Sequence, residues 1–168
     1  MPSPEGSSVT FRRVPASLRR AAIERFARKL QKEVVKSRPF DTLITGDAEL
    51  RRLNRDFRGK DYPTDVLSFP TAWQAEACQR PLAGAFLHSF SGSGRFLGDI
   101  AISLGRARTQ AREFGHTVEQ EVQILMLHGV LHLSGHDHDT DSGAMARAEK
   151  RWRARLGLPN GLIERVRS

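Results

Sequence analysis

Four of the six histidines in this chain of 168 residues lie within an eleven-residue segment, which reads HGVLHLSGHDH over positions 128–138. Side chains four residues apart in an α-helix lie one turn apart on the same face, so His128 and His132 can bind one ion. Gly135 permits a turn with positive φ just past the helix end, and this turn can bring His138 back as a third ligand. The spacing therefore predicts a metal site with the ligands His128, His132 and His138.

This histidine segment predicts the chemistry of the metal as well as its ligands. Neutral imidazole binds Zn²⁺ well, although Ni²⁺, Co²⁺ and Cu²⁺ also accept it. Three protein ligands leave a fourth position for water, and zinc-bound water is a nucleophile at neutral pH. We therefore expect one catalytic Zn²⁺ per chain. His136 is expected to be an exposed turn residue, and Asp137 either stabilises the turn or hydrogen-bonds a ligand.

The same offsets match the H-E-x-x-H-x-x-G-x-x-H zinc motif of metzincin proteases. In those enzymes the glutamate after the first histidine is the general base. Here Gly129 stands in that position and has no side chain that accepts a proton. A protease would therefore need another carboxylate close to the metal.

The charge of the chain favours a polyanionic partner. There are 27 Lys and Arg residues against 19 Asp and Glu, which gives a net charge of +8. Nucleic acid is the most common partner of such a basic protein. No segment approaches the roughly 20 apolar residues of a membrane span, and the polar first residues lack a signal core. Because Cys78 is the single cysteine, no internal disulfide is available, and we expect a cytoplasmic protein.

Hydrophobic periodicity predicts a single domain, residues 1–168, of the α+β class. Residues 1–8 are expected to be a flexible tail, and residues 71–95 an excursion loop. The predicted strands are residues 9–14, 41–45, 65–69 and 97–103. The predicted helices are residues 18–34, 47–56, 104–115, 118–133 and 141–156, with Ser17 and Thr117 as the N-caps of the first and fourth.

Three segments resemble the YbeY-type endoribonuclease family, also called rRNA maturation factors. The histidine segment matches the family signature H-G-x-L-H-L-x-G-Y-D-H except that His136 replaces the tyrosine. The second segment contains Asn54, FRGKD at 57–61 and PTDVLSFP at 63–70, and the third is LGDIAIS at 97–103. Three segments in the expected order make the resemblance specific, and it extends over about residues 40–155.

The resemblance implies a fold in which a small mixed β-sheet packs against a zincin-like metal-binding helix. It also implies an enzyme of bacteria or organelles that matures ribosomal RNA, in particular the 3′ end of the small-subunit RNA. By matched position, His128, His132 and His138 would bind the zinc. Arg58 matches the family arginine that is associated with activity.

The chemistry of arginine agrees with that role, because a phosphodiester transition state gathers negative charge and a guanidinium is planar and permanently charged. We therefore predict that Arg58 is catalytic, the alternative being an ordinary surface arginine. Lys60 is either a phosphate contact or solvated. Asp65 and Ser68 either orient groups near the metal or serve as a strand cap and a buried hydroxyl. Asp99 is expected to support the site through hydrogen bonds.

Together these observations predict a zinc-dependent, single-strand-specific endoribonuclease that acts on ribosomal RNA of the small subunit. Basic residues 51–60 and the basic helices would bind the RNA backbone, and binding would weaken with salt. One alternative is a non-catalytic ribosome-assembly factor with structural zinc, and the other is a metalloprotease. The aromatic side chains available for base stacking, most of which we expect in the core, are Phe57, Trp73, Phe86, Phe90, Phe96 and Phe114.

Overall fold

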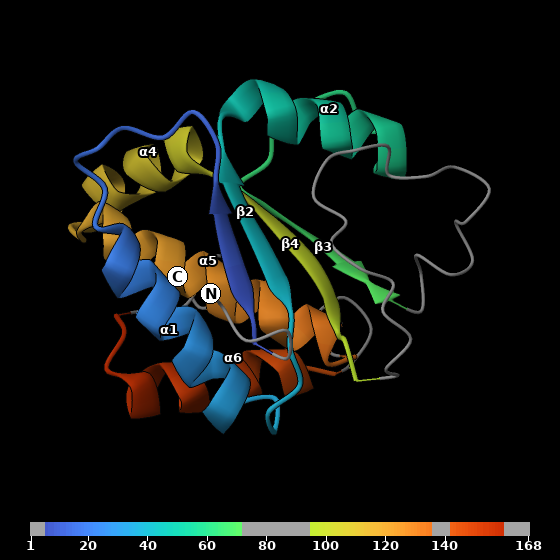
Figure 1. The fold of residues 1–168 in the computed structure, drawn as a ribbon, viewed down its shortest axis with the longest axis vertical. Coiled ribbons are helices and arrows are strands. Elements are labelled where there is room, and N and C mark those ends of the chain that lie inside the picture. Colours follow the sequence, from blue (N-terminus) through green and yellow to red (C-terminus); the bar gives the residue numbers. More distant parts are fainter. Residues whose placement is uncertain (1–5, 72–94, 136–141, 160–168) are drawn as a thin grey trace.

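The computed structural model describes residues 6–71, 95–135 and 142–159 of the chain. They form a four-stranded β-sheet with helices on both of its faces (Figure 1). The strands are β1 (Ser8–Phe11), β2 (Asp41–Thr45), β3 (Val66–Pro70) and β4 (Gly98–Ser103). The helices are α1 (Arg20–Glu33), α2 (Asp47–Arg58), α4 (Leu104–Phe114), α5 (Val118–Leu133) and α6 (Ala144–Leu156).

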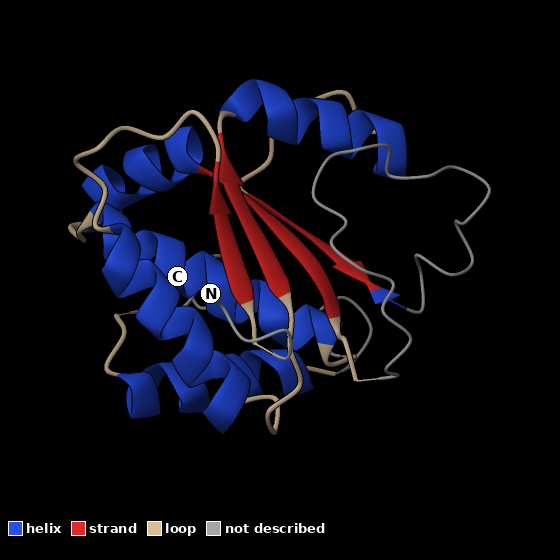
Figure 2. Cartoon of the chain, in the orientation of Figure 1, coloured by secondary structure: helices blue, strands red, loops and turns tan. Residues whose placement is uncertain are grey.

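The sheet is mixed, with the strand order β1-β2-β4-β3. Strands β1, β2 and β4 are parallel to one another, whereas β3 pairs antiparallel with β4 and forms one edge. In Figure 2 the strands lie as one layer between α2, at the top, and α1, α5 and α6, lower in the view. This arrangement confirms the predicted α+β class and its small mixed sheet.

The two faces of the sheet belong to two different hydrophobic clusters, because successive side chains of a strand point to opposite faces. On one face, Ile44, Ile100 and Ile102 pack in a cluster with the apolar residues of α1, α5 and α6. On the other face, the strand residues pack against Leu50 and Leu53 of α2. The strand members of this second cluster are Leu43, Leu67, Phe69 and Ala101. Helices α2 and α5 therefore cover opposite faces.

Helix α5 is the most deeply buried of the described helices, since 11 of its 16 residues are buried. It contacts β3, β4, α1, α4 and α6. Thr117 is its N-cap, as predicted, and it forms a capping box with Gln120. The Thr117 hydroxyl accepts from the Gln120 N–H at 3.1 Å, and the Gln120 side chain accepts from the Thr117 N–H at 3.0 Å. In the described part of the chain, no helix has the length and apolar character to cross a membrane.

Helix α5 approaches the sheet most closely where Gly129 meets Ile100 of β4. A Cβ atom at position 129 would lie 2.9 Å from Ile100 Cγ2 and 3.1 Å from Ile100 Cδ1. Both distances are shorter than ordinary van der Waals contact, so only glycine fits without movement of the core. The backbone of α5 can rest directly on β4 because Gly129 has no side chain.

Helix α1 begins later than predicted. Ser17 is not its N-cap, because the helix starts at Arg20 and Arg19 takes the cap position without a capping side chain of its own. Glu119 of α5 instead accepts a hydrogen bond from the Arg19 N–H at 3.1 Å. The predicted local cap was wrong because a residue 100 positions away supplies the carboxylate.

Helix α2 continues to Arg58, two residues beyond its predicted end. Gly59, with φ of +67°, ends the helix in the left-handed conformation that glycine adopts freely. Arg58 is therefore held in the last helical turn, not in a loop.

The remaining boundaries differ from the prediction by a few residues. Strand β1 starts at Ser8, whose hydroxyl donates to Asp41 Oδ1 at 2.6 Å, and ends at Phe11 rather than at residue 14. Helix α6 starts at Ala144 rather than at residue 141. Apart from its two ends, the predicted loop 71–95 lies outside the described residues.

We expect the substitution Gly129→Ala to destabilise the fold by about 1 kcal/mol. Alanine in a helix interior normally gains about 1 kcal/mol over glycine, but overpacking of a core costs about 1–3 kcal/mol. Urea denaturation would measure the change in the free energy of unfolding. Because the clash is with Ile100, the double variant with Ile100→Ala should lose less than the sum of the two single losses. A Gly129→Ala variant more stable than the wild type would contradict the close contact.

Candidate active site

The imidazoles of His128 and His132 converge near the C-terminal end of α5. Their Nε2 atoms lie 3.2 Å apart. The ring centroids are 4.8 Å apart and the ring planes are 72° from parallel. The four-residue spacing thus places both side chains on one face of the helix, as predicted from the sequence.

The separation of the two Nε2 atoms matches the geometry of a bound metal ion. Two nitrogens that bind one tetrahedral Zn²⁺, each at about 2.0–2.1 Å, are about 3.3 Å apart. The separation of 3.2 Å between the Nε2 atoms of His128 and His132 fits two ligands of one ion. Imidazole nitrogen is also a donor that suits zinc. These two side chains therefore fit part of a zinc site.

The rest of the predicted ligand set is partly outside the described structure. Gly135 has φ of +95°, which confirms the predicted turn after α5. His136, Asp137 and His138 lie outside the described residues. Within residues 6–71, 95–135 and 142–159, no group of three or more His, Cys, Asp and Glu side chains is arranged to hold a metal. The role of His138 as the third ligand stays a prediction.

A carboxylate of helix α6 holds the second nitrogen of His128. Glu149 Oε2 lies 2.9 Å from His128 Nδ1, and the side chains are only 1% and 6% exposed. Sequence reasoning missed Glu149. The signal was present, because Glu149 neighbours Ala148 on the same side of α6 as the buried Met145. A carboxylate on the apolar face of a helix requires a partner in the core.

The backbone beside His128 is hydrogen-bonded to the edge strand of the sheet. The Ser68 hydroxyl of β3 donates to the carbonyl of Gly129 at 3.2 Å, which joins the edge strand to α5. Because the Gly129 Cα faces Ile100, a glutamate at this position would point into the sheet. The position that carries the general base in metzincins therefore serves as a packing contact here.

Asp65 and Asp99, which the sequence analysis considered for the site, both lie in or beside the sheet. Asp65 caps the start of β3, since its Oδ1 accepts from the Val66 N–H at 2.8 Å and its Oδ2 accepts from Gln110 Nε2 at 3.0 Å. Asp99 is buried in β4 opposite Phe69, on the face that α2 covers. The side chain of Asp99 therefore points away from the face that carries His128.

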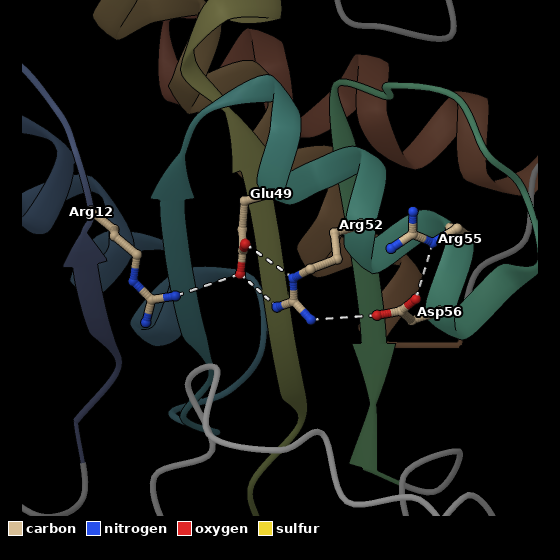
Figure 3. A network of polar contacts seen from close by, with 5 residues as sticks. All are labelled: Arg12, Glu49, Arg52, Arg55 and Asp56. Atoms are coloured by element: carbon tan, nitrogen blue, oxygen red, sulfur yellow. Dashed lines mark hydrogen bonds and ion pairs between the residues drawn. The ribbon is translucent and has the colours of Figure 1, made fainter.

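Most of the arginines on α2 are neutralised by neighbouring carboxylates (Figure 3). Arg52 donates to Glu49 Oε1 at 2.7 Å and contacts Asp56 at 3.4 Å. Arg12 approaches Glu49 from beyond β1, and Arg55 contacts Asp56 at 3.3 Å. The hydrogen bond from Arg52 holds the pKa of Glu49 below its ordinary value of 4.5, although partial burial opposes the shift.

The loop after α2 is held by similar contacts. Arg51 donates to Asp61 Oδ1 at 2.8 Å, and this hydrogen bond lowers the pKa of the exposed Asp61. Asn54, which is buried, donates to the Tyr62 carbonyl at 2.9 Å. The loop from 59 to 63 is therefore anchored to α2 at both its backbone and its side chains.

Arg58 differs from these neighbours. In the part of the chain that the structure describes, its exposed guanidinium makes no hydrogen bond or ion pair, and the same holds for the ammonium group of Lys60. No contact joins Arg58 to His128 or His132 among the described residues. Helices α2 and α5 lie on opposite faces of the sheet, but both contact the edge strand β3 (Figure 1).

Of the aromatic residues that the sequence analysis named for base stacking, Phe114, the last residue of α4, is 40% exposed. Phe57 packs edge-on against Phe69, with ring centroids 5.6 Å apart, so it belongs to the core as expected. Tyr62 is 52% exposed in the anchored loop between Lys60 and β3. Sequence reasoning missed Tyr62, although its place two residues after Lys60 was a signal. Trp73, Phe86, Phe90 and Cys78 lie outside the described residues.

Comparison with known proteins identifies relatives along the whole chain. The family model described as endoribonuclease YbeY matches residues 10–157. A Solibacter usitatus protein named endoribonuclease YbeY is 70% identical over 168 residues, which is 100% of both chains. A protein of the same name from Koribacter versatilis is 47% identical over 124 residues, covering 74% of this chain and 68% of the relative.

One solved structure resembles the fold. The solution structure of TM1509 from Thermotoga maritima superposes with a TM-score of 0.52 at 27% sequence identity. The match covers 86% of this chain and 85% of the Thermotoga chain. The similarity in structure thus covers most of both chains.

The charge network on α2 predicts a pH-dependent contribution to stability. Because the pKa of Glu49 is lowered in the folded state, its stabilising effect is complete above the ordinary value of 4.5 and disappears as the pH falls through the folded-state pKa. Glu49→Gln should therefore lower the free energy of unfolding at pH 7, by less than about 1 kcal/mol for a pair so close to the surface.

Urea denaturation of both proteins between pH 7 and pH 3 would measure this difference. It should shrink as the pH falls through the folded-state pKa of Glu49 toward the acid end of the range. A difference that stays constant down to pH 3 would exclude ionised Glu49 as its source.

Proposed function

The chain belongs to the endoribonuclease YbeY family, and on this basis we propose that it is a zinc-dependent enzyme that cleaves single-stranded ribosomal RNA. Family membership makes the chain an RNA-cleaving hydrolase. The proposed substrate is the 3′ end of the small-subunit ribosomal RNA, and the proposed compartment is the cytoplasm. The substrate follows from the match of the three sequence segments to the rRNA maturation factors, and the compartment follows from the single cysteine and the polar first residues.

The observation that carries the zinc proposal is the 3.2 Å separation of the His128 and His132 Nε2 atoms on a buried helix. His138, which matches the family's third histidine, completes the proposed set. When bound, the zinc would supply a polarised water and a positive charge close to the scissile phosphate. The chain itself keeps the ligands in place through the contacts of α5 with the sheet and with Glu149.

The proposed RNA contacts lie around the end of α2. Arg58 and Lys60 carry charges that no carboxylate of the described residues compensates, so both are available to phosphate oxygens. Arg58 would stabilise the charge that develops on the phosphate, because its guanidinium offers two parallel N–H donors. The exposed ring of Tyr62 offers a face on which a base can stack.

The edge strand β3 defines the path of the substrate in this proposal. Both α2 and α5 contact β3 from opposite faces of the sheet. An RNA strand that reaches both Arg58 and the histidines therefore has to pass around this edge. A single strand can follow such a curved path, whereas a duplex is much stiffer. This favours a single-stranded substrate.

The metal proposal is tested by metal analysis combined with RNA cleavage. We expect about one zinc per chain, loss of cleavage with a chelator, and recovery when zinc is added back. The double substitution His128→Ala, His132→Ala should remove both the zinc and the activity. His116→Ala is the matched control, because His116 lies before α5 and should leave both unchanged.

Three results would contradict parts of this proposal. Full cleavage by the pure double variant would exclude the zinc-dependent enzyme. Zinc binding without any cleavage of RNA would favour the alternative of an assembly factor with structural zinc. Peptide hydrolysis that a chelator abolishes would revive the protease hypothesis.

A second test concerns Arg58. Arg58→Ala should lower single-turnover cleavage by about 100-fold, the effect of removing one donor that stabilises transition-state charge. Zinc content and the melting temperature should not change, because Arg58 has no partner among the described residues. Arg55→Ala, one turn earlier on the same helix, is the matched control.

The control arginine is already paired with Asp56, so its removal should have a much smaller effect on cleavage. Equal losses in the two variants would mean that α2 contributes only general positive charge.

A further inference from the structure

Two observations single out Glu149 within the candidate active site. It is a carboxylate that is only 1% exposed, on a helix whose neighbouring buried residues are apolar. Its Oε2 lies 2.9 Å from Nδ1 of His128, a predicted metal ligand. Burial of a carboxylate costs desolvation free energy. Apolar residues of similar volume often join two helices with equal stability, so the packing of α6 on α5 does not by itself explain a glutamate at this position.

The chemistry of this contact determines which nitrogen of His128 carries the proton. An ionised carboxylate accepts hydrogen bonds and cannot donate them, so His128 Nδ1 must carry the hydrogen. In a neutral imidazole the other nitrogen, Nε2, then keeps its lone pair. This is the nitrogen that lies 3.2 Å from His132 Nε2.

The geometry of this contact also restrains the ring. A hydrogen bond at Nδ1 and the tight packing of a side chain that is 6% exposed leave the His128 ring little freedom to rotate. Metal ligands held in this way by a carboxylate bind more tightly, because their orientation and their tautomer are set before the metal arrives.

We propose that Glu149 is the positioning residue of the metal centre, which holds His128 in the Nδ1–H tautomer and thereby sets the affinity for zinc. The inference rests on the proposed metal site and extends it from α5 to α6. Glu149 does not touch the substrate or the metal in this proposal. It acts through His128.

Two substitutions separate this role from a purely structural one. Glu149→Gln keeps the shape, but its amide can either donate or accept, so it no longer dictates the tautomer of His128. Glu149→Leu removes the hydrogen bond altogether. Glu121→Gln is the matched control, because Glu121 is a buried carboxylate of α5 seven residues before His128.

The first measurement is zinc affinity, by competition with a chromophoric chelator. We expect a loss of about 10-fold for Glu149→Gln and about 100-fold for Glu149→Leu, the range observed when a carboxylate that orients a ligand is removed. Glu121→Gln should bind zinc as the wild type does. The second measurement is the tautomer of His128 in the metal-free protein, by ¹⁵N NMR of the imidazole nitrogens.

The wild type should show only the Nδ1–H form, and Glu149→Gln should show a mixture of both forms. If Glu149 serves only to pack α6 on α5, the melting temperature will fall and the zinc affinity will not. A folded Glu149→Gln variant with wild-type zinc affinity would overturn the proposal, whether or not Glu149→Leu folds. A wild-type protein that binds zinc but cleaves no RNA would instead overturn the proposed function and leave this inference standing.

Discussion

The contact between Gly129 and Ile100 is the constraint on which the candidate site depends. It lets the backbone of α5 pack closely on β4, because at this point only the side chain of Ile100 lies between the helix and the strand. The hydroxyl of Ser68 then reaches the carbonyl of Gly129, so the edge strand also fixes the helix beside His128. A helix held at this depth by the sheet can direct two imidazoles to one point, because neither its height nor its rotation is free to change.

The same depth of burial determines how the polar groups are paired. On α5 the buried His128 is matched with the buried Glu149 across the interface with α6. On α2 the opposite holds, since a network of exposed arginines and carboxylates surrounds Glu49 and Asp56. Arg58 stands at the end of that network without a carboxylate among the described residues. The two halves of the proposed site therefore combine a preorganised metal centre with a charge left available for phosphate.

The prediction from sequence was accurate where short-range signals decide the structure. The N-cap at Thr117 and the turn at Gly135 are properties of neighbouring residues, and both are confirmed. The start of α1 was wrong because its capping carboxylate, Glu119, comes from another helix. Glu149 was missed for the same reason, since its partner His128 is 21 residues away and on a different helix.

The amino-acid sequence by itself determined the α+β class, the pair of histidines on one helix face, the excess of positive charge and the family of the chain. Each of these is a local pattern or a sum over residues, so it can be read without knowing which elements are neighbours. Only the tertiary structure decided that Gly129 packs on the sheet, that Glu149 holds His128, and that Arg58 alone among the α2 arginines lacks a carboxylate in the described residues. These are contacts between segments far apart in the chain, and such contacts form only when burial of the two sides of the sheet brings α2, α5 and α6 into place.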